Sequence, residues 1–165
     1  MTKISGHGIS LWFFAAKLTL VALAFAPAAY ADVRSKEATL YKIHIKLDGA
    51  VMFATLEDTP TVRDFIALLP LTLKLKDYAS TEKIGFLPHK LSVVNAPDGS
   101  TPKVGDISYY APWGNLAIFY HDFAYSAQLV PLGRISVGLE HLNFSGEKHA
   151  IISLISPIET MRIQP

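Results

Sequence analysis

The sequence predicts a mainly β protein: a closed antiparallel β-barrel of about eight strands with one or two short helices. Three observations predict this fold. Many short runs have the alternation or the apolar content of strands, a single segment has clear helical periodicity, and turn-forming residues separate the runs. Closure also removes the exposed strand edges that promote aggregation. A β-sandwich would satisfy the same pattern and is the main alternative.

The first 31 residues have the pattern of a secretory signal peptide. Lys3 and Lys17 precede the apolar run Leu18–Ala26, and Ala29-Tyr30-Ala31 supplies small residues at the positions that a signal peptidase reads. This run is far shorter than the ~20 apolar residues that span a bilayer. An uncleaved N-terminal anchor is the alternative, since apolar residues also lie upstream of Lys17.

Cleavage after Ala31 would give a periplasmic or secreted protein with no membrane attachment. Residues 32–39 would then be a polar lead-in, and residues 40–165 would be a single domain. Loss of Lys3 and Lys17 from the 15 basic residues leaves 13, against 14 acidic ones. This balance, without any basic run, gives no indication of a nucleic-acid partner. The chain has no cysteine, which excludes disulfides and thiolate chemistry.

The first two strands are expected at residues 40–47 and 50–56. Alternate positions of the first run are apolar, the pattern of a half-buried strand, and these positions are Tyr41, Ile43, Ile45 and Leu47. Asp48-Gly49 between the runs accommodates the positive φ angles of a tight hairpin turn. The second run is apolar on both faces, which predicts deeper burial.

A helix is expected to begin after Thr59 and to end before Pro70. Thr59 is a good N-cap, and Pro60 suits the first helical position, where a missing N–H costs nothing. The apolar side chains lie at i, i+3, i+4 and i+7 and are Val62, Phe65, Ile66 and Leu69. Further strands are expected at 71–76, 84–87, 106–110, 116–120, 129–137 and 150–155, a helical turn at 138–142, and mostly loop at 89–104.

Residues 105–125 are rich in aromatic side chains and surround a turn formed by Pro112-Trp113-Gly114-Asn115. Most of these aromatic residues are expected to pack in the barrel, among them Tyr109, Phe123 and Tyr125. Trp113 is placed at the turn, either exposed as a contact surface or folded back over the barrel end.

Several segments together resemble a family of cyclophilin-like β-barrel proteins, the compact relatives of cyclophilin peptidyl-prolyl isomerases. They are TPTVRDFIALLPLTLKLKDY, EKIGFLPHKL, GDISYYAPWGNLAIFY and LVPLGRISVGLEHL. The resemblance covers roughly Tyr41 to Ile155. It implies an eight-stranded closed barrel with helices covering its ends.

The resemblance also implies candidate site residues. Cyclophilins hold the prolyl amide with an arginine that follows a histidine, and here His89-Lys90 places a lysine at that position. Lysine can donate a hydrogen bond but lacks the planar fork of guanidinium. The segment that lines the proline pocket in cyclophilins aligns with residues 117–120, which makes Tyr120 the aligned aromatic residue. Tyr110 and Trp113 complete the predicted ligand-binding set, and Lys90 is the candidate catalytic donor.

The function predicted from these residues is a binding module for a proline-containing peptide or a small molecule. A weak peptidyl-prolyl isomerase acting on exported proteins is the alternative, and a structural role with Trp113 as a contact is the third. No cofactor or metal is expected, because no two histidines have the spacing of a helical or strand metal site. No serine lies in a Gly-x-Ser-x-Gly elbow.

Overall fold

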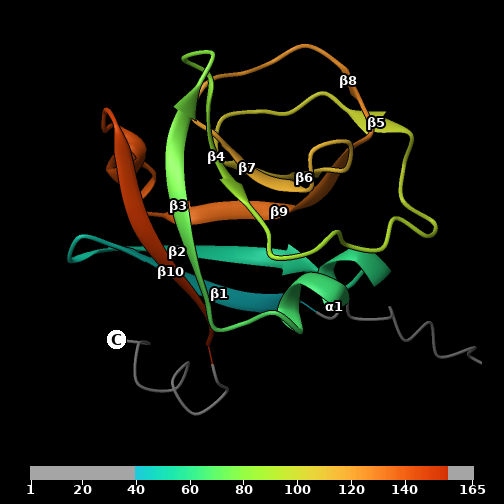
Figure 1. Cartoon of the computed structure of the whole chain (residues 1–165), viewed down its shortest axis with the longest axis horizontal. Coiled ribbons are helices and arrows are strands. Elements are labelled where there is room, and N and C mark those ends of the chain that lie inside the picture. Colours follow the sequence, from blue (N-terminus) through green and yellow to red (C-terminus); the bar gives the residue numbers. More distant parts are fainter. Residues whose placement is uncertain (1–39, 156–165) are drawn as a thin grey trace, which may run out of the picture. The chain divides into compact units, whose positions relative to one another are not determined.

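Eight antiparallel strands close into a barrel in the computed structural model, which describes residues 40–155 (Figure 1). They are β1 (Leu40–Leu47), β2 (Ala50–Glu57), β3 (Leu71–Tyr78), β4 (Glu82–Phe86), β6 (Asp106–Tyr110), β7 (Asn115–Phe119), β9 (Leu129–Val137) and β10 (Glu147–Leu154). Their order around the barrel is β1-β10-β3-β4-β7-β6-β9-β2. The predicted barrel is therefore confirmed over the sandwich. The expected signal peptide and lead-in lie outside the described residues.

The β1–β2 hairpin forms as its sequence predicts. Asp48 and Gly49 have φ angles of 48° and 87°, the left-handed conformations that a tight two-residue turn requires. The register pairs Leu47 with Ala50 and Leu40 with Glu57, so the whole length of both strands is used. The strictly alternating residues of β1 thereby point into the barrel.

The predicted helix forms but is shorter than its apolar stripe. Helix α1 (Pro60–Ile66) begins after Thr59, whose hydroxyl oxygen accepts a hydrogen bond from the Val62 N–H at 3.1 Å. The N–H groups of Leu68 and Leu69 donate to carbonyls three residues back, so a tighter turn replaces the last helical turn. The expected turn near residue 140 is the 3₁₀-helix η1 (Leu139–Leu142).

One cluster of buried side chains fills the barrel interior. Seven of the eight strands contribute to it. The exception is β4, whose inward positions include Lys83 and Gly85. Gly85 faces strand β3, where an added Cβ would meet the Leu75 Cδ2 atom at 2.9 Å. A larger residue here would force the Leu75 side chain to move.

A short second sheet lies outside the barrel, where the sequence predicts mainly loop. Strand β5 (Gly99–Ser100) pairs with β8 (Ser126–Ala127), and Figure 1 shows this pair beside the loops that flank β6 and β7. Two-residue strands have no periodicity to detect, which is why sequence analysis missed them. This pair ties the segment that follows β7 to the chain that precedes β6.

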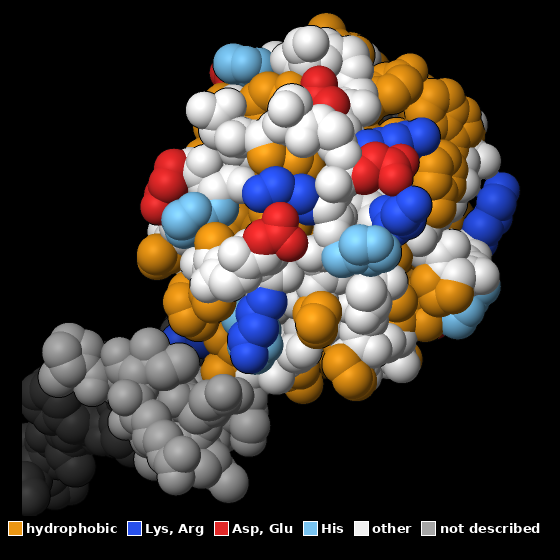
Figure 2. Space-filling model, turned by 60° about the vertical axis from the view of Figure 1, so that its left-hand side comes forward, with side chains coloured by type: hydrophobic (Ala, Val, Ile, Leu, Met, Phe, Trp, Pro, Cys, Tyr) orange, Lys and Arg blue, Asp and Glu red, His pale blue; other side chains and the backbone are white. Residues whose placement is uncertain are grey.

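The surface carries a mixture of charged and apolar side chains. Figure 2 shows acidic and basic groups interspersed on the face that it draws, without a patch of a single sign. Within residues 40–155, no helix has the length and apolarity needed to cross a membrane.

Candidate functional site

The outer wall of the barrel carries a second, smaller apolar cluster on strands β4, β7 and β9. It consists of Ile84, Ala117, Phe119 and Leu129, with Tyr110 of β6 packed against it. Strand alternation explains the two clusters, because Leu116 and Ile118 of β7 point inward while Ala117 and Phe119 point outward. Both faces of β7 are thus buried, and something must cover its outer face.

Residues 120–128 provide that cover. The Phe123 N–H donates to the Pro102 carbonyl at 3.1 Å, and the Gln128 N–H donates to the Asp98 carbonyl at 2.7 Å. Asp122 accepts a hydrogen bond from the Val104 N–H at 2.9 Å. These bonds tie the segment to the chain before β6, so it stands off the wall and encloses a space.

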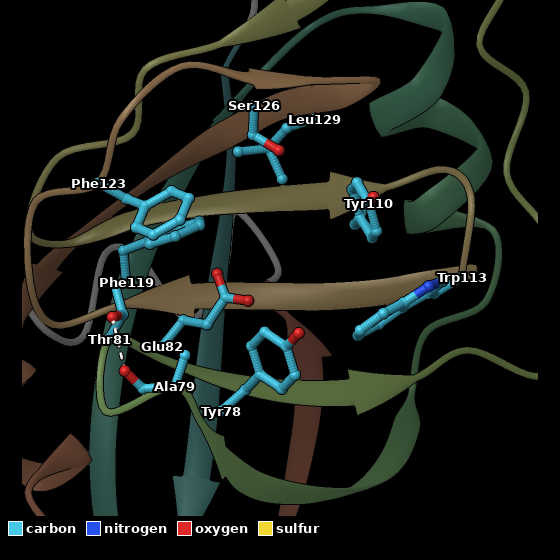
Figure 3. A pocket seen from close by; sticks show the side chains of 10 residues that line it. All are labelled: Tyr78, Ala79, Thr81, Glu82, Tyr110, Trp113, Phe119, Phe123, Ser126 and Leu129. Carbon is cyan, nitrogen blue, oxygen red and sulfur yellow. Dashed lines mark hydrogen bonds between the residues drawn. The ribbon is translucent and has the colours of Figure 1, made fainter.

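That space is an open pocket of about 180 Å³ (Figure 3). Five aromatic residues line it: Tyr78, Tyr110, Trp113, Phe119 and Phe123. The remaining lining residues are Ala79, Thr81, Glu82, Ser126 and Leu129. The aromatic residues come from the end of β3, the β6–β7 hairpin, the end of β7 and the loop after it, so only the folded barrel assembles them.

Trp113 is held at the pocket by two neighbouring tyrosines. Its ring centroid lies 5.3 Å from that of Tyr78 and 5.4 Å from that of Tyr110, at interplanar angles of 90° and 79°. Such edge-to-face contacts each contribute about 0.5–1.5 kcal/mol beyond area burial. The indole nevertheless remains 47% exposed, so one of its surfaces is free to contact a ligand.

Glu82 is the carboxyl group of the pocket. Figure 3 shows its side chain pointing into the space between Phe123 and Tyr78. Desolvation by the surrounding apolar groups raises the pKa of Glu82 to about 7, because burial disfavours the charged form. No residue in the described part of the chain donates a hydrogen bond to this carboxyl or pairs with it. A half-buried acid without a partner therefore lies at the centre of an aromatic pocket.

Lys83, the next residue, points to the other side of β4 and closes one end of the barrel. Lys83 is 2% exposed, and its ammonium group donates to Asp77 and to the Phe144 carbonyl, both at 2.6 Å. It also lies 4.3 Å from the Phe144 ring centroid and 4.8 Å from that of Tyr120. Lys83 is thus fully paired and plays no part in the pocket.

Asp77 connects this cluster to Tyr120. The Tyr120 hydroxyl donates to the same Asp77 carboxylate oxygen at 2.6 Å. The hydrogen bond from Lys83 and then that from Tyr120 hold the pKa of Asp77 below its usual value. Desolvation, with the hydrogen bond to Asp77, raises the pKa of Tyr120 to about 12. This arrangement stabilises the barrel end.

The five residues predicted for the site lie in three places. Tyr110 and Trp113 line the pocket together. Tyr120 belongs to the Asp77 cluster and does not line the pocket. Lys90 donates to the Pro112 carbonyl at 3.4 Å, on the turn that carries Trp113, and His89 is exposed beside it. Neither Lys90 nor His89 is among the lining residues.

Eight of the ten residues that line the pocket are not among the predicted site residues, and two aromatic side chains are placed differently from the prediction. Tyr78, Glu82 and Phe123 are the most informative of these. Phe123 is predicted to pack in the barrel, but it lies at the pocket and is 46% exposed. Tyr125 is exposed as well, whereas Tyr109 is fully buried as expected. The alternation of β4 offered one signal, since it sets Glu82 on the same face as Ile84.

Metal ligation has no obvious place in this part of the chain. Within residues 40–155, no three His, Cys, Asp or Glu side chains come together as a metal-binding group.

Comparison with known proteins supports the fold. The model of the cyclophilin-like family matches residues 45–153, which is more than half of the chain. The fold also resembles the solution structure of a hypothetical protein from Archaeoglobus fulgidus, with a TM-score of 0.58 and 14% sequence identity. That match covers 72% of this chain and 98% of the archaeal one, and at this identity it speaks for the fold alone. No curated protein sequence matches significantly. The chain belongs to the cyclophilin-like family.

Proposed function

We propose that the protein is a binding module and that its ligand, a small molecule or a short peptide, enters the aromatic pocket on the outer barrel wall. The observation that carries this proposal is the convergence of five aromatic side chains on one open pocket, around a central carboxyl group that no residue within 40–155 pairs with. Pockets of this composition, mostly apolar with a few placed polar groups, are the usual form of small-ligand sites.

Size limits what the pocket accepts. Its volume of about 180 Å³ lies below the ~300–1,000 Å³ of sites for drug-sized ligands. A small molecule, or a single side chain of a peptide, therefore fits better than a folded segment.

Binding can be tested with a library of small amines, amides and proline-containing dipeptides, observed by the indole N–H resonance of Trp113. We expect members of the library to shift this resonance. Trp113→Ala removes this reporter, so its affinity and that of the wild type are compared by calorimetric titration. It should weaken binding by at least about tenfold, because a central aromatic contact is commonly worth about 2 kcal/mol or more. Phe86→Ala is the matched control, since Phe86 is an exposed aromatic residue that does not line the pocket. Equal losses in both variants would contradict the proposal.

Peptidyl-prolyl isomerisation is the second candidate function, and membership of the cyclophilin-like family favours it. A protease-coupled assay with a proline peptide measures it directly, against an uncatalysed barrier of about 18–20 kcal/mol. A rate equal to the uncatalysed one would remove this candidate and leave the binding role standing. If activity appears, Lys90→Ala tests whether Lys90 contributes.

Export is part of the proposal and rests on residues 1–31. We expect the mature N-terminus to be Asp32. Mass spectrometry of protein recovered from the periplasm or the medium would determine it. A chain that stays intact and in the membrane fraction would favour the uncleaved anchor.

A further inference from the structure

Within the pocket, charge is distributed in an unusual way. Among the described residues that line the pocket, Glu82 carries the only carboxyl group, and none is a lysine, an arginine or a histidine. The other polar groups on the aromatic side of the pocket are the phenols of Tyr78 and Tyr110, which carry no carboxylate or basic nitrogen. An ionised Glu82 therefore has no compensating charge inside the pocket.

The aromatic side chains add a second preference of the same sign. The face of an aromatic ring carries partial negative charge, so a cation within about 6 Å of the ring centroid is attracted to it. The rings of Tyr78 and Tyr110 both stand at steep angles to that of Trp113, at 90° and 79°. Rings that meet edge to face are not stacked parallel, so they can border a bound cation from more than one side.

Other classes of ligand fit less well. An anion would face Glu82 and the ring faces, and both would repel it. A neutral apolar ligand would exclude water from the Glu82 carboxylate without supplying a partner. Glu82 would then have to be protonated, which weakens the binding of such a ligand above pH 7. An ammonium group satisfies the carboxylate and the rings at once. Because the pocket is small, the cation must be compact.

We propose that the pocket binds a small organic ammonium compound, with Glu82 as counter-ion and the rings of Tyr78, Tyr110 and Trp113 as the wall around the cation. This inference rests on the proposed binding function and specifies the chemical class of the ligand. Thr81 is occupied by its bond to the Ala79 carbonyl at 3.0 Å, so Glu82 is left as the charged recognition group.

A pH dependence follows from this arrangement. The pKa of Glu82 is about 7 in the empty pocket, and a bound cation lowers it, because an opposite charge favours the ionised form. Binding of a permanent cation therefore releases a proton below pH 7. Affinity should rise as the pH increases from 5 to 7 and level off above pH 7. His121 on the neighbouring loop packs against Tyr120 and does not line the pocket.

Choline and 3,3-dimethylbutan-1-ol provide a direct test, because they have the same shape and differ in charge. We expect titration of the full chain at pH 8 to show at least about tenfold tighter binding of choline. The choline affinity of the wild type should increase at least about tenfold from pH 5 to pH 7. Glu82→Gln should abolish both the preference for choline and the pH dependence. Glu140→Gln is the matched control, since Glu140 is an exposed carboxylate on η1, away from the pocket.

Each outcome separates the two proposals. Equal binding of both compounds, or an affinity for choline that does not change with pH, overturns the cation inference and leaves the pocket as a binding site. If neither compound binds, the cation inference falls as well. The binding function is also rejected if the library of amines, amides and proline-containing dipeptides leaves the Trp113 resonance unchanged. The pH measurement needs no variant, so the inference can be overturned even if Glu82→Gln does not fold.

Discussion

At the scale of single residues, the neighbours Glu82 and Lys83 differ in whether their charged groups are paired. Strand alternation points Glu82 outward, into the pocket, where no residue of the described part of the chain pairs with it. It points Lys83 toward the barrel end, where Asp77 and a backbone carbonyl pair with it. The Glu82 carboxyl group is thus available to a ligand, whereas the Lys83 ammonium group is already hydrogen-bonded within the protein. Buried charges are otherwise tolerated only when they are paired, which makes Glu82 the exception.

Glu82 should make the stability of the empty protein depend on pH. Its pKa rises from 4.5 in the unfolded chain to about 7 in the folded one, so between these values the folded state binds more protons. The free energy of unfolding should therefore increase as the pH is lowered from about 7 to about 4.5. Glu82→Gln should remove this increase and stabilise the protein at pH 8 on the order of 1 kcal/mol, after allowance for solvent screening. Urea unfolding at several pH values measures both effects. An unchanged pH profile in the variant would contradict the assignment.

Asp77 should have the opposite pH dependence. Asp77→Ala leaves the buried Lys83 ammonium without its anion, and we expect a loss of about 2 kcal/mol in the free energy of unfolding at pH 7. Since the folded-state pKa of Asp77 is lowered, its contribution is present above about pH 4 and is lost as the pH falls through that lowered pKa. The difference between wild type and variant should shrink in acid. Glu147→Ala, at an exposed ion pair with Lys74, is the control and should change stability little.

At the scale of elements, the short β5–β8 pair is one of the contacts that hold the cover of the pocket. It fixes the segment after β7, which carries Phe123 and covers the outer face of the barrel. The pair comes so close at Gly99 that an added Cβ would overlap the Ser126 carbonyl oxygen and lie 2.7 Å from the Tyr125 hydroxyl. The cover thus depends on a glycine.

Gly99→Ala should displace the cover and weaken ligand binding by more than about tenfold, while the barrel itself stays folded. The reason is that the backbone of Ser126 has to move away from the new methyl group. Gly146→Ala is the control, because it also replaces a glycine, at φ 76°, but an added Cβ meets nothing within 4 Å there. It should lower stability by about 1 kcal/mol through backbone strain and leave affinity unchanged. Choline titration with thermal unfolding of both variants measures this. Retained affinity in Gly99→Ala would show that the β5–β8 pair is dispensable.

At the scale of the whole molecule, closure joins the C-terminal strand to the first one. Strand β10 lies between β1 and β3, so residues distant in sequence share one interior cluster. A closed barrel of this kind has no unpaired strand edge at β1 or β10. We therefore expect it to unfold as one cooperative unit.

A pair of adjacent isoleucines in β10 tests this. Ile152 is fully buried, whereas Ile151 is 46% exposed. Ile152→Ala should lower the free energy of unfolding by about 2–5 kcal/mol, because it removes packed methylene groups and leaves a cavity. Ile151→Ala should cost less than about 1 kcal/mol. Guanidinium unfolding should remain a single transition in both variants. Similar losses at the two positions would mean that β10 does not close the barrel in the register described.

Most strands of the barrel were predictable because the sequence patterns that specify them span only a few residues. The alternation of β1, the Asp48-Gly49 turn and the Thr59 cap each act over a few residues, and all three appear as predicted. The first half of β10 was missed because Glu147–His149 is polar and gains its strand conformation by pairing with Lys74–Lys76. That information lies in a partner strand and not in the segment itself.

The sequence by itself determined the barrel and placed Tyr110 and Trp113 near a shared turn, because strand periodicity and turn chemistry depend on neighbouring residues. Only the tertiary structure decided the pocket. Tyr78, Glu82 and Phe123 come from three separate segments, and barrel closure with the β5–β8 pair brings them together. The physical reason is that desolvation, which raises the pKa of Glu82, arises from groups brought close only by folding.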